Sequence, residues 1–296
     1  MKKYVGLFIV LMLNVACEEV IDVEVPNEEP RLIIDALIRV DIDEPYVPVE
    51  VKLSLSSDFF SDNTPTSAES VIIQYDEYED GTIINSFFSS LAELDPGSGI
   101  YTPDPNFSSD QRIPTSILDR NLVFNLLIRH EGRLYLGSTT YVPAVPIDSV
   151  FQGDGSLFTD DETEIIVTFT DNPDEDNFYL FDFDFAEFLV TEDTFYKGQE
   201  FSFSYFYDQK FEANTEIEIG LMGADETFYN YMDLLIEQTT NNAGVFATPV
   251  ATVRGNMSDV TDIDNIDISD NVGQPDIFPL GYFAIVQQYK TSIILE

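Results

Sequence analysis

Alternation of apolar and polar residues dominates the first half of the chain. Apolar side chains occupy every second position from residue 47 to residue 55, and the alternation returns from residue 122 to residue 128. A period of two places one set of side chains on a buried face and the other in solvent, so both segments are predicted to be β-strands. Asp80-Gly81 lies between two further β-rich runs and predicts a tight hairpin, because both residues tolerate positive φ. Short strands separated by turn residues predict an immunoglobulin-like β-sandwich over residues 31–145.

Aromatic residues are denser in the second half of the chain, residues 146–296. Phenylalanine or tyrosine alternates with acidic or hydroxyl residues over residues 181–185 and again over residues 201–205. This pattern predicts long antiparallel strands with one aromatic face. The rings either fill a sandwich core or form an exposed platform for a partner, and the core is favoured because aromatic residues are also strong strand formers. The candidates for partner contact on these strands are Phe183, Phe203 and Tyr205.

One α-helix is predicted near residues 226–241. Asp225 is a suitable N-cap, and apolar residues recur at helical spacing until Asn241 ends the run. The apolar stripe contains Phe228 and Met232, which are further candidates for partner contact, although packing on the second domain's sheet is favoured because an exposed stripe is costly. The predicted fold class is therefore mainly β, with an N-terminal immunoglobulin-like sandwich and a second β-rich domain that carries one α-helix.

The N-terminus has the features of a bacterial lipoprotein signal. Residues 1–16 combine two lysines with an apolar stretch too short to span a bilayer, which is typical of a secretory signal peptide. Cys17 is the only cysteine and directly follows Ala16, so it is the expected site of lipid attachment. A signal peptide with an incidental cysteine is the alternative. We expect residues 17–30 to form an acidic tether between the lipid and the folded domains.

The chain is strongly acidic. Its 13 lysines and arginines stand against 55 aspartates and glutamates, which gives a formal net charge of −42. This balance excludes nucleic acid and anionic lipid surfaces as direct partners, because both are bound by clustered basic residues. The acids are spread along the whole chain, which favours a role in solubility; a basic partner or bound calcium is the alternative.

Calcium binds through oxygen ligands, and one predicted loop is rich in them. The candidate calcium ligands are Asp171, Asp174, Asp176 and Asn177. A second acidic run covers residues 259–270, and neither segment has the spacing of an EF-hand. Hydrated acidic loops without metal are the favoured interpretation, so no cofactor is expected to be required.

The sequence gives little support for catalysis. His130 is the only histidine and precedes Glu131-Gly132, so we expect it to be an exposed turn residue. The sequence contains no nucleophile elbow, phosphate loop or dinucleotide fingerprint, and one histidine is too few for a typical zinc site. A hydrolase that uses two carboxylates remains open, because two acids at a suitable separation suffice for glycoside hydrolysis. We expect a protein that is not an enzyme.

Several short motifs, in order along the chain, resemble one family. They are Cys17-Glu18-Glu19-Val20-Ile21-Asp22, Arg31-Leu32-Ile33-Ile34, Ser98-Gly99-Ile100-Tyr101, Val142-Pro143-Ala144-Val145-Pro146-Ile147-Asp148-Ser149, Asp171-Asn172-Pro173, Asn177-Phe178-Tyr179 and Leu280-Gly281-Tyr282-Phe283. By the order and spacing of these motifs, the chain resembles the Bacteroidota outer-membrane lipoproteins grouped as domain of unknown function 4249, over nearly its full length.

The resemblance implies a binding role without a known reaction. Proteins of this family look like partners of TonB-dependent, SusC-like outer-membrane transporters. The resemblance therefore implies a non-enzymatic accessory or ligand-capturing subunit, in a role like that of SusD-like lipoproteins. It also implies a lipid-anchored protein of the outer membrane that faces the extracellular side. The alternatives are a structural subunit of a larger outer-membrane assembly or secretion machine and a carboxylate-dependent surface hydrolase.

Overall fold

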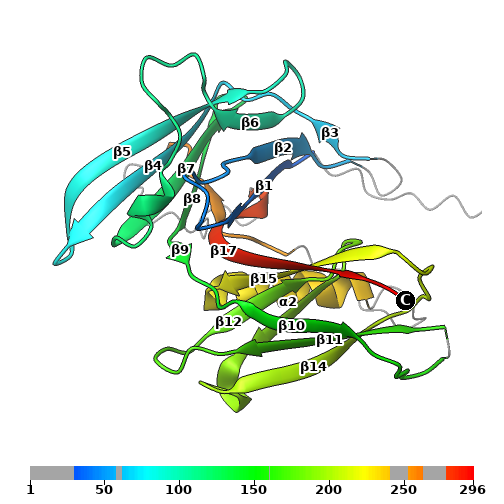
Figure 1. Cartoon of the computed structure of the whole chain (residues 1–296). Helices are drawn as coiled ribbons and strands as arrows, with labels where there is room; N and C mark the ends of the chain where they lie inside the picture. The colour runs from blue at the N-terminus through cyan, green and yellow to red at the C-terminus, as the bar shows by residue number, and fades with distance from the viewer. Residues whose placement is uncertain (1–29, 58–61, 160, 241–252, 263–277) are drawn as a thin grey trace, which may run out of the picture.

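The computed structural model describes residues 30–57, 62–159, 161–240, 253–262 and 278–296 (Figure 1). Strands outweigh helix in this part of the chain, so the predicted mainly β class is confirmed. The predicted lipidation site Cys17, the signal peptide and nearly all of the tether lie outside the described residues. The immunoglobulin-like connectivity of the first part stays a prediction.

The first half of the chain supplies most strands of a large sheet. These strands are β1 (Leu32–Val40), β2 (Val51–Leu55), β3 (Thr64–Pro65), β4 (Ser70–Glu79), β5 (Thr82–Glu93), β6 (Ile100–Pro103), β7 (Leu122–His130), β8 (Arg133–Thr139) and β9 (Tyr141–Val142). A 3₁₀ turn, Thr115–Ile117, precedes β7. Asp80 and Gly81, with φ of 50° and 75°, connect β4 to β5, so the predicted hairpin is confirmed. Apolar side chains such as Ile73 and Phe124 form one buried core.

The second half adds further strands and the helix. These elements are β10 (Ile147–Gln152), β11 (Thr163–Thr170), β12 (Phe178–Asp182), β13 (Phe188–Glu192), β14 (Glu200–Tyr207), β15 (Glu216–Ala224), α2 (Glu226–Thr240), β16 (Met257–Asp259) and β17 (Leu280–Ile294). A 3₁₀ turn, Asp193–Phe195, follows β13. Of the described strands, 14 form one sheet, while β10, β11 and β14 form a separate three-stranded sheet. None of the helical segments that the structure describes has the length and apolar character needed to cross a membrane.

Strand β17 belongs to both parts of the molecule. Residues 280–287 pair in parallel with β1, and residues 288–294 pair antiparallel with β15. Figure 1 shows this long strand running between the two parts. Both faces of its first half are buried, because Phe283 belongs to the first core and Tyr282 to the cluster beneath the helix. The expected domain boundary near residue 145 stays a prediction. The pairing of β17 with β1 places a strand from the second half of the sequence in the sheet of the first half.

The second part is built in three layers. Helix α2 packs through Phe228 against one face of the sheet of β12, β15 and β17, where it meets Met222. The opposite face of that sheet packs on β10, β11 and β14, and aromatic rings such as Phe181 and Phe203 lie between the layers. The main-chain N–H of Phe228 donates a 2.7 Å hydrogen bond to the Asp225 carboxylate, so the predicted N-cap is confirmed.

Candidate functional site

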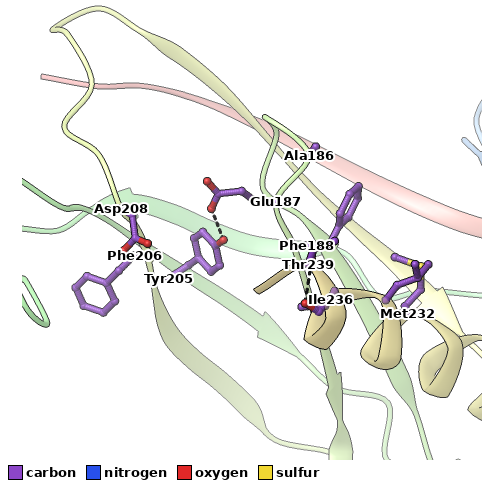
Figure 2. A pocket seen from close by; sticks show the side chains of 10 residues that line it. Ala186, Glu187, Phe188, Tyr205, Phe206, Asp208, Met232, Ile236 and Thr239 are labelled. Atoms are coloured by element: carbon purple, nitrogen blue, oxygen red, sulfur yellow. Dashed lines mark hydrogen bonds between the residues drawn. The ribbon is translucent and has the colours of Figure 1, made fainter. Parts of the chain in front are cut away.

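A pocket of about 540 Å³ lies between helix α2 and the other layers of the second part. Its wall combines the helix, the turn between β12 and β13, and the end of β14 (Figure 2). The lining residues are Ala186, Glu187, Phe188, Tyr205, Phe206, Asp208, Met232, Leu235, Ile236 and Thr239. This volume falls in the range of small-molecule sites, and apolar side chains predominate in the wall, as they do in such sites.

The turn that forms one side of the pocket has an unusual backbone. Asp184, Phe185 and Ala186 have positive φ, of 64°, 49° and 62°. This left-handed region is unfavourable for residues with a Cβ, so surrounding contacts must hold the turn. The Glu187 N–H donates to the Asp184 carbonyl at 2.8 Å, and the Asp184 N–H donates to the Asp182 carboxylate at 3.0 Å. These bonds place the side chain of Glu187 beside the pocket.

Tyr205 is fixed against a fully buried ring. It stacks on Phe183 with ring centroids 3.8 Å apart and planes 8° from parallel. The Tyr205 hydroxyl donates a hydrogen bond to the Glu187 carboxylate (Figure 2). Burial, and then the neighbouring Glu187, raise the pKa of Tyr205, so its hydroxyl remains a protonated donor. The Phe183 carbonyl accepts a 2.5 Å hydrogen bond from the Tyr207 hydroxyl, which further fixes β12 against β14.

Two carboxylates are the only charged groups among the lining residues. Glu187 and Asp208 are both acidic, and no lysine or arginine lines the pocket among the residues that the structure describes. Such a pocket favours a ligand with an apolar body and a cationic or hydrogen-bond-donating group, and it disfavours an anion. Within the described ranges, no group of three or more histidine, cysteine, aspartate or glutamate side chains is placed to hold a metal ion.

The five residues predicted to contact a partner have different surroundings. Phe183 and Phe228 are buried in the two cores of the second part. Phe203 is half-buried and packs against the same core as Phe183. The structure therefore supports the core interpretation for these three rings rather than an exposed platform. Tyr205 and Met232 also pack in the cores, but both reach the pocket wall, where a ligand can touch them.

In the acidic loop between β11 and β12, two of the predicted calcium ligands bond to other protein groups. Asp171 is buried and accepts hydrogen bonds from the Tyr179 hydroxyl at 2.6 Å and from the Gly198 N–H at 2.7 Å. Asp176 is exposed and pairs with Lys197 at 2.6 Å. Both carboxylates therefore have protein partners in the described part of the chain.

The two other predicted calcium ligands form hydrogen bonds through their own main-chain N–H groups. The Asp174 N–H donates to the Asn172 side chain at 3.2 Å, and the Asn177 N–H donates to the buried Asp193 carboxylate at 2.9 Å. The side-chain oxygen of Asn177 is buried and has no hydrogen-bond partner in the described part of the chain. A bound water or ion would satisfy that oxygen. Calcium binding at this loop stays a prediction.

His130 is buried at the end of β7, so the expectation of an exposed turn residue is wrong. The strand alternates buried side chains from Leu122 onward, and the period of two places His130 on the buried face. Its Nε2 lies 2.9 Å from the Thr66 hydroxyl. In the described chain no carboxylate bonds to its other ring nitrogen, where a catalytic triad has its orienting acid.

Sequence analysis did not identify Glu187, Phe206 or Asp208 as site residues. The turn before Glu187 contains no glycine, proline or asparagine, and its one turn residue, Asp184, is a weak signal among alternating aromatic and acidic residues. Phe206 did carry a signal, because it is an aromatic residue on the face of β14 that otherwise presents Ser202 and Ser204. A break of this kind in the alternation marks a strand end whose second face is also covered.

Comparison with known proteins identifies a family but no activity. No curated protein matches the sequence. One chain from a structure concerning host cell surface retention of a 1.5-MDa bacterial ice-binding adhesin matches at 9% identity with a TM-score of 0.18. The match covers 90% of this chain and 65% of that chain, so less than two thirds of the other protein is spanned, and a score this low carries no argument. The model of the domain of unknown function DUF4249 matches residues 18–266, and the chain therefore belongs to this family.

Proposed function

We propose that this protein is a non-enzymatic subunit that captures a ligand for a TonB-dependent, SusC-like transporter, while a lipid on Cys17 anchors it to the outer face of the outer membrane. The observation that carries the binding part is the apolar, acidic pocket between α2 and β14. The transporter and the anchor are supported by the motifs of the sequence. The same proposal includes an immunoglobulin-like fold for residues 31–145, which would serve as the scaffold for the part that binds the ligand.

The chemistry of the wall defines the class of ligand. Phe188, Met232 and Ile236 offer apolar surface for the body of a small molecule or a side chain. Tyr205 bonds to one oxygen of the Glu187 carboxylate, and the other oxygen accepts no hydrogen bond from the described residues. An amine or guanidinium placed there gains a charge-assisted hydrogen bond. The ligand is therefore apolar with one cationic end.

A matched pair of probes tests this class. Calorimetric titration of the full chain with 2-phenylethylamine and with phenylacetate compares one aromatic body with two opposite charges. We expect binding of the amine and none of the acid. The substitution Glu187→Gln should weaken the amine about tenfold, because a hydrogen bond between charged groups is lost.

The control for that substitution is Asp95→Asn, which removes one exposed negative charge outside the pocket. It should leave the affinity for 2-phenylethylamine unchanged. Equal binding of both probes, no binding of either, or equal losses in the Glu187 and Asp95 variants would each contradict the proposed pocket chemistry.

The transporter part has its own test. The full chain, carrying an affinity tag after Glu296, is recovered from gently solubilised outer membranes. We expect a barrel transporter to come with it in near-equal amount. Recovery of the chain by itself, in detergent that preserves other membrane complexes, would contradict the accessory role and leave the pocket chemistry standing.

One observation also favours the hydrolase alternative, because Glu187 and Asp208 share a pocket and paired carboxylates are the minimum for glycoside hydrolysis. Substitution of each carboxylate decides between the two functions. A hydrolase requires that Glu187→Gln and Asp208→Asn each abolish turnover of a chromogenic glycoside. A binding subunit releases the glycoside unchanged.

A further inference from the structure

Strand β5 leaves much of one edge unpaired. Along residues 82–91 it pairs with β4, and on its other side it meets β6 only at Leu91, Ala92 and Glu93. In the described part of the chain, no strand pairs with the outer edge of residues 82–89, whereas the Ser90 N–H donates to the Gln111 side chain and the Ser90 carbonyl accepts from the Asp104 N–H. Alternate N–H and C=O groups of an edge strand point outward, so this edge is a template for one more strand.

The free edge carries an unusual concentration of exposed apolar side chains. Ile84 is 48% exposed and Phe88 is 54% exposed. The residue before each of them, Ile83 and Phe87, is exposed as well. Phe88 also meets the exposed ring of Phe107 edge-on, with centroids 5.9 Å apart. Figure 1 shows the β4–β5 hairpin projecting from the body of the molecule. Contiguous exposed apolar surface of this kind marks an interaction site.

The sequence lacks two of the usual protections against strand addition at this edge, charge and proline, and the one irregularity of the β4–β5 register lies near the hairpin end, at Ile84. No charged residue and no proline lies between Gly81 and Ala92, in a chain whose net charge is −42. Natural edge strands are normally blocked by lysine, by proline or by inward-pointing charges. An uncharged, apolar edge in so acidic a protein is therefore a surface suited to pairing.

The charges around the edge indicate the kind of strand that fits. Exposed Glu79 and Asp80 flank the hairpin end of β5, and exposed Asp95 lies just beyond its other end. A second copy of the chain would bring the same acids, and its own charge of −42, against them. A partner strand with lysine or arginine at its ends would instead gain attraction at both.

We propose that the free edge of β5 takes up an extended segment of a partner protein as an added β-strand, and that this segment is apolar along its middle and basic at its ends. Main-chain hydrogen bonds supply the affinity, and alternate side chains of the segment pack beside Ile84 and Phe88. The inference deepens the accessory-subunit part of the proposed function. It rests on that function only for the location of the partner protein, at the outer membrane. Its test does not involve the ligand pocket.

Synthetic peptides test the pairing directly. The parent probe is a short fluorescent peptide of alternating valine and threonine with a lysine at each end, titrated against the full chain by fluorescence anisotropy. Two derivatives carry N-methyl groups on alternate main-chain amides. The first is methylated at the odd-numbered residues and the second at the even-numbered residues. Only one set of amides faces β5 in an added strand, so one derivative should lose about tenfold or more in affinity while the other binds like the parent.

Changes in the peptide ends and in the protein complete the test. A peptide with glutamate in place of the lysines should bind about tenfold more weakly. The substitutions Ile84→Ser and Phe88→Ser should weaken the parent peptide, whereas Phe195→Ser, which removes a ring that is 90% exposed elsewhere, should not.

Four results would overturn the inference. They are no binding of the parent peptide, equal binding by the two N-methylated peptides, no preference for basic ends, and a dimer of the chain in light scattering that Ile84→Ser disrupts. The last would show that a second copy occupies the edge. A failed pocket titration would leave the inference intact, so the two proposals fail separately.

Discussion

The Arg39 guanidinium donates a 2.6 Å hydrogen bond to the Asp182 carboxylate and so joins β1 to β12, the strand that enters the pocket turn. The other oxygen of Asp182 accepts the N–H of Asp184, the first residue of that turn with positive φ. One carboxylate thus connects the first part of the molecule to a strained turn beside the candidate site. The pair therefore anchors the pocket turn to β1.

The substitution Arg39→Met removes the cation and keeps an apolar stem. The side chains of Arg39 and Asp182 are 33% and 17% exposed, so we expect a loss of about 1 kcal/mol in the free energy of unfolding, typical of a partly screened pair. We also expect weaker binding of 2-phenylethylamine, because the turn that carries Glu187 loses an anchor. Urea unfolding and calorimetric titration measure the two effects.

The matched control is Lys52→Met, which breaks the exposed pair of Lys52 with Glu50. It should change the free energy of unfolding by less than about 0.5 kcal/mol and leave probe binding unaltered. If Arg39→Met behaves like this control in both measurements, the Arg39 and Asp182 pair does not support the turn.

Phe183 is expected to be essential for folding rather than for partner contact. Its ring is fully buried and stacks on Tyr205. Phe183→Ala should therefore lower the free energy of unfolding by about 3–5 kcal/mol, as truncation of a buried phenylalanine does. Phe195→Ala, at a ring that is 90% exposed, should cost less than about 0.5 kcal/mol in the same urea titration. Similar small losses in both variants would show that Phe183 is not a core residue.

Features with local chemistry were predictable from the sequence. The Asp80-Gly81 hairpin and the Asp225 N-cap each depend on a few adjacent residues, and both were confirmed. The alternation from residue 47 to residue 55 correctly predicted the buried positions up to Leu53, whereas Leu55 is only partly buried and the regular strand begins only at Val51. In these cases backbone preference and burial favour the same local structure, so the sequence of a single segment is enough to predict it.

Features that depend on distant segments were not predictable. The parallel pairing of β1 with β17 leaves no local signal, because it joins the two ends of the described chain. The pocket turn has only a weak signal, Asp184, because Phe185 and Ala186 are not turn residues; local bonds to Asp182 and a bond from Tyr207 on β14 to the Phe183 carbonyl hold its backbone. The free edge of β5 was also missed, because a strand pattern shows which residues alternate but not which neighbours a strand has.

Gly281 is expected to be required for the pairing of β17 with β1. Its φ is 96°, and a Cβ at this position would lie far inside contact distance of the Ile34 carbonyl oxygen. Gly281→Ala should therefore cost about 3 kcal/mol or more, through both backbone strain and displacement of β1. Thermal unfolding measures the loss.

Gly132→Ala separates strain from displacement. Gly132 has a φ of 75°, but a Cβ there meets nothing within 4 Å. It should cost only about 1 kcal/mol, from strain alone. Equal losses in the Gly132 and Gly281 variants would contradict a close approach between β17 and β1.

Asp259 joins β16 to β8 through hydrogen bonds to its carboxylate. Arg133 donates to one oxygen at 2.7 Å, and the Thr261 N–H donates to the other at 2.9 Å. Burial alone raises the pKa of Asp259, but the hydrogen bonds from Thr261 and Arg133 outweigh it and hold the pKa below its ordinary value. The folded state therefore binds this proton less readily than the unfolded chain does.

This pKa shift predicts a pH-dependent contribution to stability. Because the folded pKa lies below the unfolded value of about 3.9, the contribution is fully present above that pH and is lost as the pH falls through the folded pKa. We expect the difference in the free energy of unfolding between the wild type and Asp259→Asn to stay constant above about pH 5 and to shrink as the pH falls below about 4. Both proteins share the remaining acids, so the difference isolates Asp259. Arg133→Gln should reduce the same pH dependence, and a difference that stays constant or grows on acidification would contradict the paired carboxylate.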